Sequence, residues 1–315
     1  MSNIHLPGLT VREGCAADLP QVKTICADVH DGDDYVPHVW TEWASNPANH
    51  LYIFELDGKP AALYCLRLGL AGPGSGWIQG VRVARAYQRQ GIAAVLIQHA
   101  IERSRTFDLS VLRYTTAADN VPMHRLAESS GFQHAGIFMN YPFVKLDPPP
   151  HTPLPARLVV PSEFDGAYNM IINSVEYLTT NGFYCDAWLW KPLSIDALRE
   201  HIERCEVYSP TGALTALAIM TRSSDGSFWL PYMVGEAQAQ RVILASLVKK
   251  VLSLTPPQQE INFCAQLPHT LNNEQLLTQF GFAPDSIEPY MWLYELVLDE
   301  TGVPQINDNP SFVDE

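Results

Sequence analysis

Hydrophobic and polar positions in the first half of the chain follow a strand, loop and helix pattern. Apolar, β-rich runs at 51–55 and 61–68 flank Asp57-Gly58, a pair typical of a tight hairpin turn. A third run at 77–83 leads to Gly91, after which apolar residues recur at helical spacing. The pattern continues with a strand at 111–116, a short helix at 120–129 ended by Gly131, and more strand at 132–146.

The second half repeats this order. Runs at 213–220 and 227–234 flank Asp225-Gly226, and they precede a helix at 240–252, a strand at 260–265, a helix ending at Phe280, and a strand at 291–297. The alternation predicts an α/β (α+β) chain of two tandem domains, each a mixed, mostly antiparallel sheet flanked by helices.

A proline-rich segment predicts the boundary between the two domains. Five prolines stand between Asp147 and Pro155, where they favour an extended spacer over helix or sheet. We therefore expect a catalytic domain at 1–146, a linker at 147–156, a second domain at 157–300 and a loose tail at 301–315.

Charge and cysteine content narrow the function classes. The formal net charge of −14 disfavours nucleic acid and anionic membranes as partners. The sequence has no apolar run of ~20 residues, so we expect no membrane span. The first ten residues lack the pattern of a secretory leader. The six scattered cysteines predict reduced thiols rather than disulfides or a zinc site. We expect a cytoplasmic protein without a metal; nothing in the sequence indicates its oligomeric state.

The segment Gln88-x-x-Gly91-x-Ala93 is the first chemical signal. It places a glycine at the first turn of a helix, directly after a strand. The first N–H groups of a helix lack internal partners and lie at its positive end, so they favour an anion such as a pyrophosphate. Arg85 and Arg89 add positive charge to this loop.

This loop resembles the acetyl-CoA pyrophosphate loop of the GNAT superfamily of N-acetyltransferases. Asn120, followed by Gly131-Phe132, is similar to the second signature of that superfamily, and the likeness covers about residues 9–145. The resemblance implies bound acetyl-CoA and a strand ending at Val83 that diverges from its neighbour. The cofactor-binding residues expected from loop and resemblance are Val81, Val83, Gln88, Arg89, Gln90, Gly91, Ile92, Ala93 and Asn120.

A narrower likeness concerns the acceptor. The strings from Asp33 to His38 and from Gln79 to Val83, with Trp43, look like the superfamily branch that contains vertebrate histidine N-acetyltransferase. The implied reaction is direct attack of a primary amine of a small molecule, such as an amino acid like histidine, on the thioester. The residues expected to bind this acceptor are Asp33, Asp34, Tyr35, Trp43 and Gln79.

The proton-transfer residues depart from the superfamily pattern. Superfamily members usually place a tyrosine acid seven residues after the asparagine, and here that position is Ala127. His124, three residues earlier on the same helical face, is the candidate replacement, ahead of Ser129 and Ser130. Candidates for accepting the amine proton, directly or through water, are Asp33, Asp34, Tyr35 and Glu42. Arg82 and Arg67 could face a substrate carboxylate, and cross-strand pairing with Glu55 is the alternative.

Two other functions remain open at this level. The second half has Glu236 and no glycine where its helix begins, so we expect a degenerate domain that shapes the acceptor site. The missing tyrosine is compatible with a non-catalytic sensor of acyl-CoA or of an amino acid. An acidic groove would suit a protein or peptide N-acetyltransferase.

Overall fold

The computed structural model describes residues 6–145, 155–223, 225–256, 258–268, 270–285 and 290–298. The described chain forms two compact units. The first contains the described residues of Met1–Thr115, Pro122–Gln133 and Tyr294–Glu315, and the second those of Thr116–Val121 and His134–Leu293. The units therefore exchange segments between the two halves of the sequence. Most of the predicted linker and the predicted tail lie outside the described residues, so these boundaries stay predictions.

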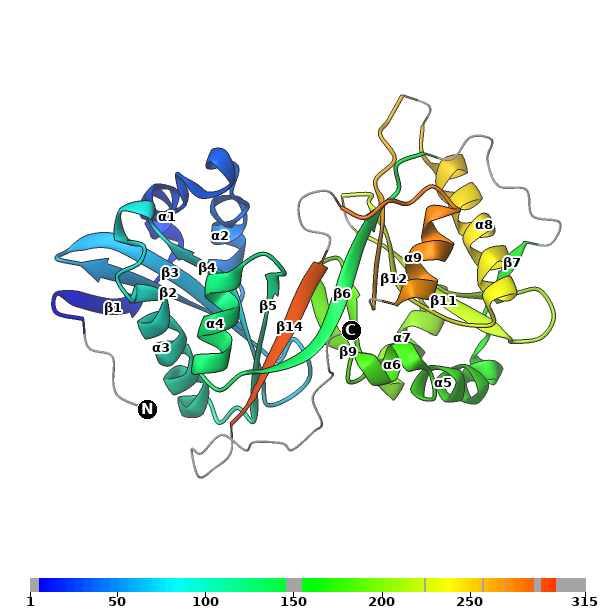
Figure 1. Cartoon of the computed structure of the whole chain (residues 1–315), viewed down its shortest axis with the longest axis horizontal. Helices are drawn as coiled ribbons and strands as arrows, with labels where there is room; N and C mark the ends of the chain where they lie inside the picture. Colours follow the sequence, from blue (N-terminus) through cyan, green and yellow to red (C-terminus); the bar gives the residue numbers. More distant parts are fainter. Residues whose placement is uncertain are drawn as a thin grey trace. The chain divides into compact units, whose positions relative to one another are not determined.

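The first unit is built on a mixed sheet. Its strands, in spatial order, are β1 (Leu9–Glu13), β2 (Asn49–Leu56), β3 (Lys59–Leu68), β4 (Ser75–Val83), β5 (Val111–Ala117, to Thr115) and β14 (Tyr290–Val297, from Tyr294). Neighbours from β1 to β4 are antiparallel, whereas β4 and β5 are parallel. Figure 1 shows β14, drawn in red near the end of the colour bar, beside β5.

Helices cover both faces of this sheet. They are α1 (Leu19–Cys26), α2 (Val36–Ser45), α3 (Ile92–Thr106) and α4 (Val121–Ser129), with 3-10 turns η1 (Ala16–Asp18), η2 (Val29–Gly32) and η3 (Arg85–Tyr87). On one face, Ile25 of α1 and Trp40 of α2 pack with Ile53 and Leu63 in one buried cluster. On the other face, His99 of α3 contacts the rings of β2 and β3. The hairpin turn at Asp57 and Gly58 has positive φ at both residues, as the sequence predicts.

The second unit repeats this plan. Its sheet runs β6 (Gln133–Pro142), β13 (Phe263–Pro268), β12 (Phe228–Gly235), β11 (Ala216–Arg222), β10 (Val207–Pro210) and β7 (Ala156–Leu158), and only β12 and β13 are parallel. The flanking elements are η4 (Pro161–Glu163), α5 (Phe164–Ile172), α6 (Val175–Thr179), α7 (Ile195–Glu203), α8 (Ala237–Leu254) and α9 (Leu271–Thr278), with a separate hairpin of β8 (Phe183–Asp186) and β9 (Leu189–Pro192). The predicted α/β class with mostly antiparallel sheets is confirmed.

Two features of the described residues concern the expectations from composition. No described helix combines the length and the apolar character that crossing a bilayer requires. None of the six cysteines is bonded to another; Cys26, Cys65 and Cys185 are buried, and Cys15 and Cys205 are exposed.

Candidate functional site

The first unit contains a fork between two parallel strands. The register of β4 with β5 starts at Ser75↔Val111 and ends at Trp77↔Arg113. Although β4 continues to Val83 and β5 to Ala117, no later pair between them occurs among the described residues. The predicted divergence of the strand ending at Val83 is confirmed. Peptide groups of β4 beyond Trp77 therefore border an opening in the sheet.

A bulge changes the course of β4 inside this fork. The register with β3 shifts between Leu63↔Arg82 and Cys65↔Gln79, which leaves one extra residue on β4. Gly80 lies there with a φ of +63°, and a Cβ at this position would be 2.9 Å from the ring of Trp43. Glycine thus permits both the backbone conformation and the close approach of Trp43 of α2.

The loop after β4 has an open row of backbone amides. Arg89 and Gly91 have positive φ values of 61° and 84°, and Gly91 is the N-cap residue of α3. Among the described residues, the N–H groups of positions 89 to 93 have no hydrogen-bond partner. A Cβ on Gly91 would meet no atom within 4 Å, so the space at this position of the loop is open.

Side chains of the loop hold its shape. Gln88 donates from Nε2 to the carbonyl of Val83 at 3.1 Å, and Gln90 donates to the carbonyl of Ala86 at 3.2 Å. Ile92 is buried under the start of α3, whereas residues 88 to 91 are exposed. Asn120 lies just before α4, and its amide donates to Thr116 Oγ1 at 3.0 Å.

The predicted acceptor residues are divided between solvent and a buried ion pair. Asp34 is 2% exposed and forms a two-point contact with Arg82, at 2.6 Å from Nε and 2.9 Å from Nη2. It also accepts the N–H of Val36 at 3.2 Å. Burial pushes the pKa of Asp34 upward, but the hydrogen bonds and charge of Arg82 outweigh burial, and the pKa is lowered overall.

Aromatic rings lie next to this pair. The Arg82 guanidinium is 5.4 Å from the centre of the Tyr35 ring, and the edge of Tyr35 faces Trp43 at 6.1 Å. Tyr35 is 48% exposed, and Asp33 is exposed as well. Gln79, one residue before the bulge, donates to Cys65 Sγ at 3.4 Å.

The contacts of Asp34 bear on the role predicted for it. Both of its oxygens are engaged by Arg82, so the arrangement favours holding Arg82 and α2 in place over accepting a proton. Arg82 pairs with Asp34 and not with Glu55, because β3 lies between β2 and β4 in the sheet. Glu55 pairs instead with Arg12 of β1.

His124 has a partner that sequence reasoning missed. Its Nδ1 lies 2.8 Å from the hydroxyl of Tyr294, a residue 170 positions later in the chain. Ala127, at the position where the superfamily has tyrosine, is fully buried. Ser129 donates to the carbonyl of Leu126 at 3.1 Å. No local signal in the sequence points to Tyr294, because the contact depends on β14 joining the first unit.

The second unit has a matching fork but not the loop. The β12–β13 register runs only from Phe228↔Phe263 to Leu230↔Ala265. At the start of α8, Glu236 is the N-cap residue, and Gln240 donates to the carbonyl of Gly235 at 2.9 Å. A Cβ on Gly235 would be 2.4 Å from Ala216 Cα of β11, so Gly235 packs directly against that strand.

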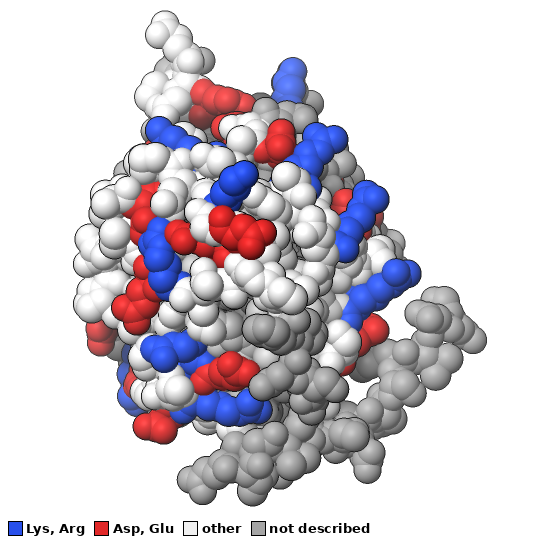
Figure 2. Space-filling view, turned by 90° about the vertical axis from the view of Figure 1, so that its left-hand side faces the viewer, with Lys and Arg blue, Asp and Glu red and all other residues white. Residues whose placement is uncertain are grey.

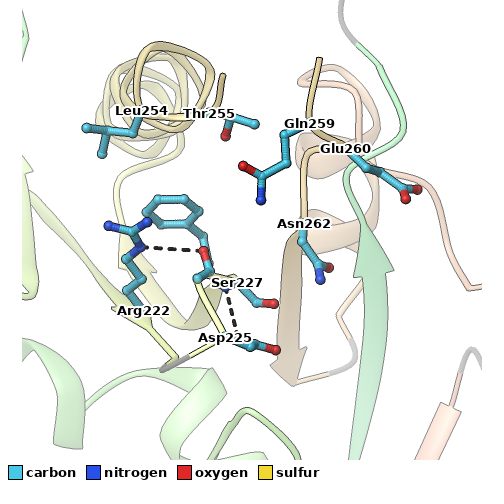
Figure 3. A pocket seen from close by; sticks show the side chains of 10 residues that line it. Arg222, Asp225, Ser227, Leu254, Thr255, Gln259, Glu260 and Asn262 are labelled. Carbon is cyan, nitrogen blue, oxygen red and sulfur yellow. Dashed lines mark hydrogen bonds between the residues drawn. The ribbon is translucent and has the colours of Figure 1, made fainter. Parts of the chain in front are cut away.

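A pocket of about 310 Å³ lies elsewhere in the second unit (Figure 3). It is lined by Arg222 and Phe228 at the β11–β12 turn, by Leu254 at the end of α8, and by Gln259, Glu260 and Asn262 before β13. The Nε of Arg222 donates to the carbonyl of Gly226 at 3.4 Å on one side of the pocket. The cavity is therefore at the opposite end of β12 and α8 from the segment that corresponds to the glycine loop.

Charges on the first unit are mixed. Figure 2 shows acidic and basic side chains interspersed on the displayed face, without a continuous basic patch of the kind that tracks a phosphate backbone.

Comparisons with known proteins agree with this geometry. Residues 18–132 match the profile described as the acetyltransferase (GNAT) family. A search of curated proteins found no match.

Among solved structures, a GCN5-related N-acetyltransferase from Sphaerobacter thermophilus aligns at 12% identity and a TM-score of 0.61, covering 92% of this chain and 96% of its own. A tandem GNAT protein from the clavulanic acid biosynthesis pathway aligns at 15% identity and a TM-score of 0.54. The alignment covers 92% of this chain and 98% of that protein. A glucosamine N-acetyltransferase region of a fungal multi-domain β-N-acetylglucosaminidase aligns at 11% identity and a TM-score of 0.62. This alignment covers 93% of this chain and 38% of that one. At these identities the likeness shows the fold.

Residues 18–132 are thus similar to the acetyltransferase (GNAT) family, and the chain as a whole shares its fold with a solved tandem GNAT protein.

Proposed function

We propose that this chain is a cytoplasmic N-acetyltransferase that moves an acetyl group from acetyl-CoA to a primary amine of a small molecule, an amino acid such as histidine. The observation that carries the proposal is the open row of amides at positions 89 to 93, at the end of one branch of the β4–β5 fork. Oriented N–H groups at a helix start, with open space at the Cβ position of Gly91, suit the diphosphate of coenzyme A.

The fork between β4 and β5 is the proposed binding site for the pantetheine arm of acetyl-CoA. Pantetheine carries amides, which pair with free peptide groups on the diverging part of β4 as an added strand does. The thioester would then lie near the bulge, where the N–H of Val81 is our candidate for binding the developing oxyanion. Donors of this kind contribute about 3 kcal/mol of barrier reduction.

The chemistry needs no protein nucleophile. The amine nitrogen forms a bond with the thioester carbon, the carbon–sulfur bond breaks, and the electron pair leaves on sulfur. Cys65 pairs with Gln79 beside the bulge in β4. Burial raises the pKa of the Cys65 thiol to about 12. Cys65 therefore stays protonated at neutral pH, which supports direct attack over an acyl-cysteine route.

The acceptor side combines aromatic surface with an internally neutralised ion pair. The exposed part of Tyr35 and the ring of Trp43 offer faces to a cationic amine. Arg82 and Asp34 neutralise each other, whereas the exposed carboxylate of Asp33 adds a negative charge next to them in the sequence. Histidine as the acceptor rests on the short sequence likeness around Asp33–His38 and Gln79–Val83.

The cofactor site is tested by Gly91→Glu. A carboxylate at this N-cap position would repel the diphosphate and cover the amides, so we expect the acetyl-CoA affinity to fall by more than about tenfold. Gly58→Glu is the matched control, because Gly58 also has positive φ and open space around its Cβ position but lies in the hairpin turn. Isothermal titration measures both variants. Equal affinity in wild type and Gly91→Glu would reject the site.

A turnover assay separates an enzyme from a sensor. The buried Ala127, in place of a tyrosine acid, favours the sensor. We expect release of free thiol from acetyl-CoA, followed with a thiol-reactive dye, when free amino acids including histidine are added. Cofactor binding without thiol release for any amino acid, polyamine or peptide would establish the sensor. Activity on peptides alone would establish a peptide N-acetyltransferase.

A further inference from the structure

Among the described residues, one arginine on the sheet of the first unit has no carboxylate partner. The other arginines on its strands, Arg12, Arg82 and Arg113, each pair with a carboxylate. Arg67 of β3 forms no ion pair and no side-chain hydrogen bond within the part of the chain that the structure describes. Its side chain is partly exposed, so it is accessible to a small molecule.

The side chain of Arg67 lies on the face of the sheet that α2 covers. Arg67 is directly opposite Asn49 of β2, and opposite residues of an antiparallel pair point to the same face. The amide of Asn49 donates to the carbonyl of Trp43 in α2 at 3.3 Å. Cys65, two positions before Arg67, packs in the buried cluster with residues of α1 and α2. Both contacts place Arg67 on the α2 side.

This face also carries the groups around the bulge in β4. Arg67 is opposite Trp77, the last residue of β4 that pairs with β5, so it is level with the base of the fork. Gln79 follows two positions later on β4, and the ring of Trp43 is next to Gly80. Arg67 and the proposed acceptor residues therefore border the same region of the sheet.

The other arginine near this region, Arg82, is already engaged. Its Nε and Nη2 bond to Asp34, and its Nη1 donates to the carbonyl of Val81 at 3.0 Å. Each of its nitrogens thus has a partner, and its charge is neutralised. Arg67 keeps its charge and its donors, and a guanidinium presents two parallel N–H groups that match the geometry of a carboxylate.

We propose that Arg67 binds the carboxylate of the acceptor, so that this chain selects α-amino acids over amines that lack a carboxylate. This inference rests on the proposed acetyl transfer and names the substrate class of that site. The amine of an α-amino acid is attached to the carbon next to the carboxylate. A carboxylate held at the base of the fork therefore restricts the amine to a few positions near the thioester.

The test compares a free amino acid with its own carboxamide, which keeps the side chain and the amine but lacks the carboxylate charge. The pair is histidine and histidinamide, or the amino acid with the fastest thiol release and its amide. We expect the wild-type kcat/KM for the amino acid to exceed that for the carboxamide by about tenfold to a hundredfold, as loss of a hydrogen bond between charged groups predicts.

Arg67→Gln in the full chain should remove this preference. We expect its kcat/KM for the amino acid to fall by about tenfold to a hundredfold, mainly through a higher KM for the amino acid. The kcat/KM for the carboxamide and the KM for acetyl-CoA should stay within about twofold of wild type. Arg67→Lys keeps the charge without the paired donors, so it should recover part of the preference.

Arg105→Gln is the matched control. Arg105 is exposed on α3 and likewise forms no ion pair among the described residues, so its loss removes the same charge from the same unit. We expect this variant to keep the wild-type preference for the amino acid.

An active wild type that treats amino acid and carboxamide alike, or prefers the carboxamide, would overturn the role of Arg67 and leave the proposed function standing. Equal losses for both acceptors in Arg67→Gln would also overturn it, because they would indicate a purely structural role. A wild type that binds acetyl-CoA but turns over no amine would overturn the proposed function, and this inference with it.

Discussion

At the scale of single residues, the contact between Asp34 and Arg82 joins the parts of the proposed acceptor site. Arg82 comes from the bulged strand β4, and Asp34 directly precedes α2, so the pair joins two elements that border the fork. Both side chains are largely withdrawn from water, which makes the loss of either partner costly.

Asp34→Asn should destabilise the fold by about 3 kcal/mol, because it leaves the Arg82 cation without its carboxylate. Asp33→Asn, at the exposed neighbouring position, should change the free energy of unfolding by less than about 0.5 kcal/mol. Urea unfolding at neutral pH compares the two variants. Equal stabilities would show that the ion pair does not hold this region.

The same pair predicts a pH dependence. The pKa of Asp34 is below its ordinary value of 3.8 in the folded chain, so the unfolded chain binds this proton first on acidification. The stabilisation is complete well above pH 3.8 and is lost as the pH falls through the lower folded pKa. We expect the unfolding free energy of wild type to decline more steeply below about pH 4 than that of Asp34→Asn.

At the scale of elements, the bulge in β4 couples a strand to a helix. Gly80→Ala adds a Cβ at positive φ that also meets the Trp43 ring at 2.9 Å. Gly58→Ala, at φ +76° with no atom within 4 Å, measures the backbone cost alone. We expect Gly80→Ala to lose about 1–3 kcal/mol more than Gly58→Ala in the free energy of unfolding. Similar losses would mean that α2 adjusts freely to the bulge.

At the scale of the whole molecule, two similar units differ in their capacity for a ligand. Both have a fork after a short parallel register, but the N-cap residue of the following helix is a glycine with open space at its Cβ position in the first unit and a glutamate in the second. In the second, Gly235 lies against β11, and Glu236 brings a carboxylate to the helix start.

We therefore expect one acetyl-CoA per chain in isothermal titration, and no remaining binding in Gly91→Glu. Two equivalents in wild type, or one equivalent that persists in the variant, would show that the second unit binds the cofactor as well.

Local features of the sequence determined much of the fold and the loop at residues 88–91, the proposed cofactor site. Strand and helix periodicity, the Asp57-Gly58 turn and the glycine at the start of α3 depend on residues within one element and its neighbours, so they were readable in advance. The spacing from Asn120 to Phe132 is equally local.

Only the tertiary structure decided which side chains meet. Asp34 and Arg82 are 48 positions apart, and His124 and Tyr294 are 170 apart. Such contacts depend on strand order and on the exchange of β6 and β14 between the units, which no local pattern specifies. Glu55 is a plausible partner for Arg82 along the sequence, but the intervening strand β3 separates them in space.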